Sequence, residues 1–310
     1  MPWLDNARIL ELTDVPEHLV ILGGSYIALE FGQIFRRFGA QVTIIERGSQ
    51  LVFREDADVA VAITEILELE GIDVVLDASA VSGAPEREGV ALTIEQAGEQ
   101  RRVIGSHLFV AVGRTPNSDG LKADTAGIEL DDRGFIVVDD YCRTTADGVF
   151  PVGDINGHGA FIHTSANDAE IVLDQMRGGS RKLSDRFPVY DLFIDPALGR
   201  VGMTEKEAVA KGLNVLTATR RMSQIGRAKE MGETLGFAKL LVDADADTDL
   251  ILGAAILGPG GDEIVNMLAA FMYSGLPCRR YRKSVLVHPT ISELMPWILD
   301  SLKPVESSVG

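Results

Sequence analysis

The chain has 310 residues and a net charge of −17, with 46% hydrophobic and 24% charged residues, as expected for a globular protein of two or three domains. A negative field of this size repels nucleic acid and anionic lipid, so neither is an expected partner. The longest apolar run, residues 250–257, is far too short to span a membrane. The two cysteines, Cys142 and Cys278, lack redox-pair or zinc-ligand spacing; we therefore expect no metal site and a reducing, cytoplasmic location.

The first part of the sequence predicts alternating strands and helices. A short apolar run at 19–22 ends at Gly23-Gly24, and apolar residues then recur every three or four positions as far as Gly39. This pattern is typical of a strand followed by an amphipathic helix. Further strands are predicted at 42–45 and 72–76, with a helix between them from about Asp56 to Gly71. Such alternation implies a parallel sheet with right-handed crossovers.

The middle of the chain predicts shorter strands and one longer helix. The helix begins near Thr164 and ends at Gly178-Gly179, where a polar boundary extends to Arg186. The short strands before it are predicted at 90–96, 100–104, 107–112, 136–138 and 149–152.

The last part of the chain predicts strands joined by turns and short helices, which favours an antiparallel sheet and an α+β domain. The predicted strands lie at 189–194, 215–219, 237–242 and 251–257, and the predicted helices at 204–211, 261–273 and 291–302.

The turn after the first strand predicts a dinucleotide site. Gly23 and Ala28 occupy the first and third positions of a GxGxxA fingerprint, and Ser25 stands at the second, where glycine is usual. The helix that follows offers free N–H groups to a pyrophosphate. Glu46, at the end of the second strand, can accept hydrogen bonds from the ribose hydroxyls, which favours NAD over NADP, although the adjacent Arg47 weakens this preference. The alternative is a glycine turn without a ligand and a solvated Glu46.

Four motifs follow one another along the chain: Gly24-Ser25-Tyr26-Ile27-Ala28-Leu29-Glu30, Ala111-Val112-Gly113-Arg114-Thr115-Pro116-Asn117, Val149-Phe150-Pro151-Val152-Gly153-Asp154 and His288-Pro289-Thr290-Ile291-Ser292-Glu293. Together they resemble the pyridine nucleotide–disulfide oxidoreductases, a family that includes dihydrolipoamide dehydrogenase, glutathione reductase and mercuric reductase. The Ser25 variant with the later Phe53-Arg54-Glu55-Asp56 is similar to mercuric reductase and its FAD-containing relatives.

The resemblance implies an α/β chain with a Rossmann-like nicotinamide domain at 16–113, after a connector at 1–15. The second part of an FAD-binding domain would follow at 114–183, and an α+β dimerisation domain at 187–310. The family's first flavin segment, with its own glycine fingerprint and a cysteine pair, has no counterpart in this sequence. We therefore expect only a partial FAD site, in a fragment, a truncated reading frame or one of two polypeptides.

The same resemblance assigns residues to the flavin. Gly113 would let a strand end approach the cofactor closely, within the motif that includes Arg114. Asp154 would accept a hydrogen bond from the ribityl chain. The helix that begins near Thr164 would direct its positive N-terminus at the flavin pyrimidine ring, which stabilises the anionic reduced flavin.

Two residues of the first helix also have implied roles. Tyr26 matches the family tyrosine that covers the flavin until nicotinamide displaces it. Glu30 matches a glutamate that pairs with a lysine near the flavin.

His288 and Glu293 are the predicted catalytic residues. The resemblance makes His288 the acid–base group, provided by the partner subunit, and imidazole can exchange a proton with a leaving thiol near neutral pH. Glu293 would orient it. Thr290 and Glu293 also have the spacing of a helix capping box, and both interpretations can hold.

The implied activity is transfer of hydride from NAD(P)H to FAD and on to a disulfide, a metal ion or another acceptor. The alternative is a catalytically inactive, NAD-binding, dimer-forming fragment. In either case we expect a two-fold homodimer through residues 187–310. The apolar side chains expected at that interface are Leu268, Phe271, Met272, Leu294, Met295, Trp297 and Ile298.

Overall fold

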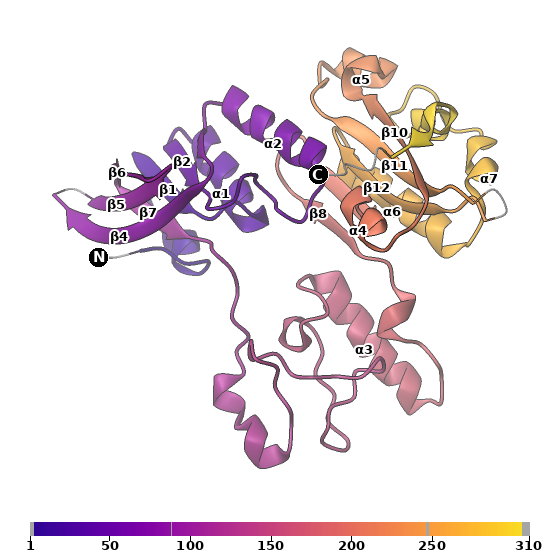
Figure 1. Cartoon of the computed structure of the whole chain (residues 1–310), viewed down its shortest axis with the longest axis horizontal. Coiled ribbons are helices and arrows are strands. Elements are labelled where there is room, and N and C mark those ends of the chain that lie inside the picture. Colours follow the sequence, from indigo (N-terminus) through magenta and orange to yellow (C-terminus); the bar gives the residue numbers. More distant parts are fainter. Residues whose placement is uncertain (1–2, 88, 246–247, 306–310) are drawn as a thin grey trace. The chain divides into compact units, whose positions relative to one another are not determined.

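A computed structural model describes residues 3–87, 89–245 and 248–305. These residues form two compact units (Figure 1). The first combines the described parts of Met1–Val112 and Pro188–Gly310, and the second is Gly113–Phe187. Among the described residues, none of the helices has the length and apolar character that a membrane crossing requires.

The N-terminal part of the first unit contains a parallel four-stranded sheet in the order β3-β2-β1-β7. Its apolar strand residues are buried; Leu19 and Ile21, for example, have no exposed surface. The elements are β1 (His18–Leu22), α1 (Tyr26–Arg37), β2 (Gln41–Ile45), α2 (Ala57–Leu69), β3 (Asp73–Val75) and β7 (His107–Val110). The predicted alternation of strands and helices is therefore confirmed.

A three-stranded antiparallel sheet lies between β3 and β7 in the sequence, in the order β4-β5-β6. Its strands are β4 (Ala78–Glu86), β5 (Gly89–Gln96) and β6 (Glu99–Gly105). The β5–β6 pair was predicted, but β4 was not. Most of β4 is exposed, and its small and polar residues provide no alternating apolar signal.

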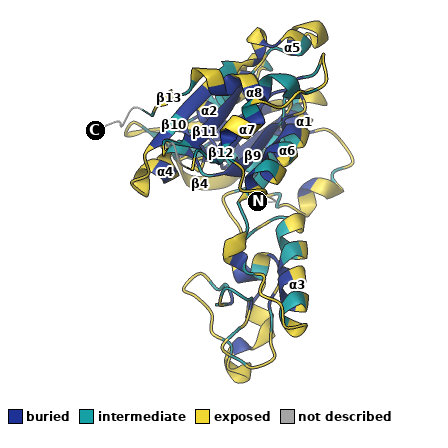
Figure 2. Ribbon diagram, turned by 90° about the vertical axis from the view of Figure 1, so that its right-hand side faces the viewer, coloured by how far each residue is buried: buried dark blue, intermediate teal, exposed yellow. Residues whose placement is uncertain are grey.

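The C-terminal part of the first unit contains a six-stranded sheet in the order β13-β10-β11-β12-β9-β8. Helix α6 (Gly261–Tyr273) packs against β9 and β12 (Figure 2). The strands are β8 (Val189–Leu192), β9 (Leu198–Gly202), β10 (Val215–Arg221), β11 (Phe237–Asp243), β12 (Ile251–Leu257) and β13 (Lys303–Pro304). The shorter helices are α4 (Glu205–Ala210), α5 (Gly226–Met231), α7 (Cys278–Arg282) and α8 (Met295–Ile298).

In this region one strand was missed and one predicted helix was wrong. Strand β9 was missed because its sequence, Leu-Gly-Arg-Val-Gly, has no apolar alternation, although all five residues are buried. The continuous helix predicted over 291–302 is instead a 3₁₀ turn at Ser292–Leu294, the short α8, and a second 3₁₀ turn at Leu299–Ser301. Pro296 has no N–H to donate, so it is compatible with the first turn of α8 but not with a helix interior.

One hydrophobic core joins both parts of the first unit. Ile21 and Leu29 belong to the same cluster of buried side chains as Leu192, Phe237 and Leu257. Gln33 on α1 extends this connection with polar contacts, because its amide oxygen accepts from the N–H of Asp195 at 2.7 Å. The N-terminal and C-terminal parts of the first unit therefore share one core.

The second unit has helix α3 (Ile162–Met176) and a small core that includes Cys142, Ile171 and Leu183. Its short 3₁₀ turns lie at Asp119–Leu121, Ala123–Ala126, Asp154–Asn156 and Leu183–Asp185. The strands predicted at 136–138 and 149–152 were wrong: among the described residues, 136–138 contributes only an isolated bridge, Leu130 with Ile136. The apolar signal reflects burial in a loop-rich core, where Ile136 N–H bonds to a turn carbonyl, that of Ile155.

Candidate functional site

The turn between β1 and α1 requires glycine. Gly23 has a φ of +110°, and a Cβ there would lie 2.5 Å from the carbonyl oxygen of Ala111 on the neighbouring chain segment. At Gly24 a Cβ would lie 2.7 Å from Leu51 Cδ2. The fully buried Ala28 provides the small residue at which α1 approaches the sheet. This packing places the N-terminus of α1 at the carboxyl edge of β1.

That helix N-terminus is suited to an anion. The side chain of Ser25, the residue before α1, makes no capping hydrogen bond, and the first turn of the helix contains no acidic residue. The first-turn N–H groups of a 12-residue helix are therefore available, together with its positive dipole end. The residues present fit the pyrophosphate of a dinucleotide.

Glu46 is fixed beside the same turn. Its Oε2 accepts from the backbone N–H of Gly24 at 2.7 Å, and its Oε1 accepts from Gly48 N–H at 2.8 Å. Each oxygen accepts one backbone hydrogen bond and retains a further lone pair for a ligand hydroxyl. The structure therefore brings Glu46 to the glycine turn, as the spacing predicted, although its ribose contact stays a prediction.

Tyr26, the first residue of α1, donates its hydroxyl to Glu55 Oε1 at 3.1 Å. Tyr190 on β8 donates to the same oxygen at 2.8 Å, and the two rings meet edge to face with centroids 5.6 Å apart. Burial and the Glu55 charge raise the pKa of both tyrosines, so both phenols stay protonated donors. The sequence analysis assigned no role to Glu55 or Tyr190; the one available signal was that Glu55 lies within the Phe53-Arg54-Glu55-Asp56 motif.

Glu30 lies one turn further along α1. Its Oε1 accepts from the backbone N–H of Phe193 at 3.0 Å. Burial raises the pKa of this carboxyl group, and the Phe193 hydrogen bond opposes the shift. The lysine partner implied for Glu30 stays a prediction.

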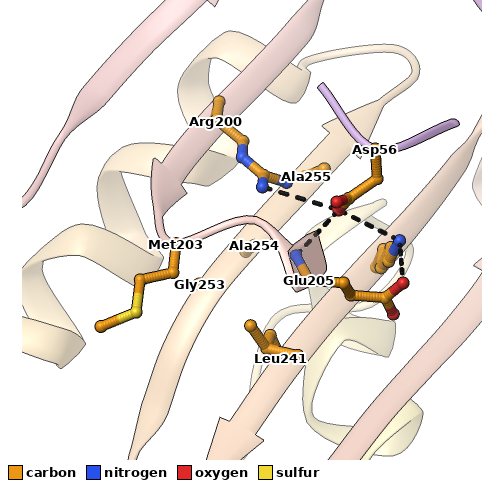
Figure 3. Close-up of a pocket in the computed structure, with 9 residues that line it drawn as sticks. Asp56, Arg200, Met203, Glu205, Leu241, Gly253, Ala254 and Ala255 are labelled. Carbon is orange, nitrogen blue, oxygen red and sulfur yellow. Dashed lines mark hydrogen bonds and ion pairs between the residues drawn. The ribbon is translucent and has the colours of Figure 1, made fainter. Parts of the chain in front are cut away.

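A cluster of charged side chains lies next to Glu55, where the segment before α2 meets the C-terminal sheet (Figure 3). The Lys239 ammonium is 2.9 Å from Asp58 and Glu205 and 3.3 Å from Asp56. Arg200, only 2% exposed, lies 3.7 Å from both Glu55 and Asp56. Because the two cations lie among the carboxylates, the charges of the cluster neutralise one another.

In the second unit, Arg114 and Asp154 form an ion pair of 2.7 Å. Gly113 has a φ of +148° and open space where a Cβ would stand. Helix α3 begins at Ile162, two residues before the predicted position; the Thr164 hydroxyl donates to Phe161 O at 2.8 Å and thereby stabilises the first turn. Asp154 and the N-terminus of α3 both lie in this unit, and the flavin contacts expected of them stay predictions.

His288 and Glu293 lie together. The imidazole Nδ1 is 2.9 Å from both carboxylate oxygens of Glu293, and the His288 side chain is 80% exposed against 17% for Glu293. Glu293 also donates its backbone N–H to Thr290 Oγ1 at 3.2 Å. Of the predicted capping box, the described residues show only this backbone hydrogen bond, because the Glu293 carboxylate contacts His288 instead. The catalytic roles of His288 and Glu293 stay predictions.

The two cysteines are free and buried. Burial and nearby Asp168 raise the pKa of Cys142 to about 11, and burial with the Asp249 contact raises that of Cys278 to about 12. Both are poor thiolates at neutral pH. Within the described ranges, no group of three His, Cys, Asp or Glu side chains is placed to hold a metal ion.

Comparison with known proteins defines the class. Residues 2–169 match the family described as "Pyridine nucleotide-disulphide oxidoreductase", and residues 190–299 match its dimerisation domain. The chain belongs to the pyridine nucleotide-disulphide oxidoreductase family, as the four motifs predicted.

Individual relatives agree with this assignment. The chain is 38% identical over 291 residues to the probable pyridine nucleotide-disulfide oxidoreductase RclA of Escherichia coli K12, covering 93% of this chain and 65% of RclA. It is 32% identical to the dihydrolipoyl dehydrogenase of Geobacillus stearothermophilus, covering 94% of this chain and 62% of that enzyme. The chain thus spans slightly less than two thirds of the length of these relatives.

Solved structures show the same fold. The Cu(II) complex of the HOCl-induced flavoprotein disulfide reductase RclA from E. coli has a TM-score of 0.88 at 35% identity, covering 96% of this chain and 68% of that chain. LpdA from Mycobacterium tuberculosis has a TM-score of 0.87 at 23% identity, covering 96% of this chain and 64% of that chain, and shows the likeness of fold alone.

Proposed function

We propose that this chain binds a nicotinamide dinucleotide as part of a flavin-dependent oxidoreductase. The observation that carries the proposal is the uncapped N-terminus of α1 with the Glu46 carboxylate held 2.7 Å from Gly24 N. The pyrophosphate would lie at the helix N-terminus, and the ribose hydroxyls would donate to Glu46. Residues 16–113 would form this nicotinamide domain, 114–183 part of the flavin domain, and 187–310 the dimerisation domain.

NAD is the preferred cofactor in this proposal, because a ribose 2′-phosphate would face the Glu46 charge. The test is calorimetric titration of NADH and NADPH into the unmutated chain and into Glu46→Ala. We expect NADH to bind more tightly than NADPH, and the substitution to weaken NADH by about tenfold, the loss of one charge-assisted pair. An NADPH preference in the unmutated chain would contradict the assignment.

FAD, when bound, would accept hydride from the nicotinamide and pass electrons to the acceptor. This chain's own residues would orient it: Asp154 would accept from its ribityl chain, and the α3 N-terminus would direct positive charge at its ring. His288, oriented by Glu293, would give and take a proton at Nε2. The acceptor would be a disulfide, a metal ion or another small molecule; the RclA structure with Cu(II) supports including metal ions.

An inactive, NAD-binding fragment is the second candidate. It is favoured by the two buried cysteines with raised pKa values, neither of which is suited to dithiol chemistry. An absorbance scan of the purified chain separates the candidates. The first requires flavin to copurify, or NADH oxidation to rise above background on addition of FAD; failure of both favours the second.

We also propose a homodimer through residues 187–310. Four of the seven apolar side chains expected at the interface, Leu268, Met272, Met295 and Ile298, are instead buried in their own domain. Three exposed apolar side chains close in sequence to His288 support the contact. Val285 is 97% exposed, Val287 76% and Trp297 53%. Light scattering at micromolar concentration should give twice the chain's 33.4 kDa, and a monomeric mass would remove the trans-subunit role of His288.

A further inference from the structure

Residues 51–56, called the strap below, lie against the dinucleotide turn. The N–H of Val52 donates to the carbonyl oxygen of Gly24 at 2.8 Å, and a Cβ on Gly24 would lie 2.7 Å from Leu51 Cδ2. Leu51 and Val52 are buried, with 0% and 1% of their surfaces exposed. Gly24 donates its own N–H to Glu46. Gly24 is thus held through its N–H by Glu46 and through its carbonyl by the strap.

Val52 has an unfavourable backbone conformation. Its φ is +43°, in the left-handed region, where a β-branched side chain crowds the backbone. A residue keeps such a conformation only where its surroundings impose it. Within the strap, the N–H of Glu55 donates to the Val52 carbonyl oxygen at 2.7 Å. The position of Val52, and with it that of Gly24, therefore depends on what holds the rest of the strap.

The C-terminal part of the first unit holds the strap in place. The Lys206 ammonium, on α4, donates to the carbonyl oxygens of Phe53 at 2.5 Å and Glu55 at 2.7 Å. The Asp56 carboxylate accepts from the backbone N–H of Glu205 at 3.1 Å (Figure 3) and from that of Lys206 at 3.2 Å. Four hydrogen bonds from α4 therefore fix residues 53–56, although Lys206 lies 150 positions beyond Asp56 in the sequence.

We propose that Lys206 is a positioning residue for the dinucleotide. By anchoring the strap, it keeps Val52, and through it Gly24, in the geometry that receives the pyrophosphate. The inference rests on the proposed function, in which the N-terminus of α1 and Glu46 bind the dinucleotide. Lys206 acts through the strap rather than through contact with the ligand. A residue of the C-terminal part thus sets the affinity of a site built by the N-terminal part.

Lys206→Met tests this role, because it keeps the apolar stem of the side chain and removes the ammonium. Two charge-assisted hydrogen bonds to the strap are lost, whereas the backbone N–H of residue 206 can still reach Asp56. The unfavourable φ of Val52 then favours release of the strap. If the turn keeps its binding geometry for about a third of the time, the apparent affinity falls about threefold. NADH and ADP-ribose should lose affinity by the same factor, because both contain the pyrophosphate and the adenosine ribose.

The experiment titrates NADH and, separately, ADP-ribose into the full chain and each variant by calorimetry. Circular dichroism first checks that every variant is folded under these conditions. Lys206→Arg retains a cationic donor for the two carbonyl groups and should bind both ligands within about twofold of the unmutated chain. Lys211→Met is the matched control, because it removes an exposed ammonium at the opposite end of α4. It should leave both affinities unchanged.

Hydrogen exchange of the Val52 amide, measured without ligand, reports on the strap itself. This N–H is donated to Gly24 in a buried residue, so it exchanges only when the strap opens. In the unmutated chain we expect protection of about tenfold or more. In Lys206→Met the amide should exchange within about threefold of the rate of an unstructured peptide, since the strap is open most of the time. Amides in the centre of β12 should stay protected by about a thousandfold or more, which shows that the chain remains folded.

Three results would overturn the proposal. Lys206→Met may not bind both ligands as tightly as the unmutated chain, its loss of affinity may not leave the Val52 amide protected, and Lys206→Arg may not lose as much affinity as Lys206→Met. A loss confined to NADH would also contradict it, since both ligands use the turn. Any of these results, with both ligands bound by the unmutated chain, leaves the proposed function intact. If the unmutated chain binds neither ligand, the proposed function is wrong, and the role of Lys206 with it.

Discussion

Lys239 is the cation on which the buried charged cluster depends, and its removal should strongly destabilise the fold. It is 3% exposed, with Asp56 (6% exposed) and Glu205 close to its ammonium. Breaking a buried pair by removing one partner costs about 3–5 kcal/mol. Arg200 still faces Asp56 after Lys239→Met, and the half-exposed Asp58 adds little. We therefore expect the lower end, about 3 kcal/mol.

Urea unfolding followed by circular dichroism measures this loss. A change of about 3 kcal/mol lowers the midpoint by about 1–1.5 M for a slope of about 2–3 kcal/mol/M. The matched control is Lys211→Met on the exposed end of α4, which should change stability by less than about 0.5 kcal/mol. A loss below about 1 kcal/mol for Lys239→Met would refute the view that the cluster is held together by this cation.

The charges around Asp56 also determine the direction in which the free energy of unfolding changes with pH. Burial raises the pKa of Asp56, but Lys239, the N–H groups of Glu205 and Lys206, and Arg200 together bring it below its usual 3.8. A carboxyl group with a lowered folded pKa stabilises the protein above its unfolded pKa, and this contribution is lost as pH falls through the folded value. The difference in stability between the unmutated chain and Lys239→Met should therefore narrow as the pH falls, because without Lys239 the Asp56 carboxylate takes up a proton at a higher pH than in the unmutated chain. A difference in stability between the two proteins that becomes larger in acid would contradict this expectation.

Three further substitutions or reactions test other parts of the structure. Gly23→Ala should destabilise the fold by about 2 kcal/mol or more, because of its positive φ and the close carbonyl of Ala111, as measured by thermal unfolding. Glu293→Gln should lower turnover by about tenfold or more in an enzyme reconstituted with flavin, with nicotinamide affinity unchanged in the same preparation. Cys142 and Cys278, with pKa values of about 11 and about 12, should react with a thiol reagent at pH 8 only after unfolding; rapid labelling of the native chain would show that they are accessible.

Much of the fold was predictable because its signals are local. The βαβ pattern and the glycine turn follow from apolar periodicity within about twenty residues, and α6 was predicted with the bounds that it has in the structure. Strands β4 and β9 were not predictable in this way. Each is specified by its neighbours in the sheet: β9 is buried between β8 and β12, despite two glycines and Arg200.

The contacts of the candidate site likewise include some that the local sequence predicts and some that it does not. The proximity of Glu46 to Gly24, and of His288 to Glu293, follows from motifs with fixed spacing. The contact of Glu55 with Tyr190 joins residues 135 positions apart, and nothing in either local sequence indicates it. Such a contact arises where the segment before α2 meets strand β8, which only the tertiary structure reveals.

The unit that contains the nucleotide turn is discontinuous in sequence, since residues 113–187 intervene between its two halves. A peptide bond cut within that intervening segment would therefore leave the two flanking pieces associated. The shared hydrophobic core and the buried ion pair of Lys239 with Asp56 would hold them together without a covalent link. The chain is thus suited to fragment complementation, in which separately produced halves reassemble. A chain cleaved by a protease within residues 113–187 would keep its native size in a sizing measurement, because the two pieces would stay associated.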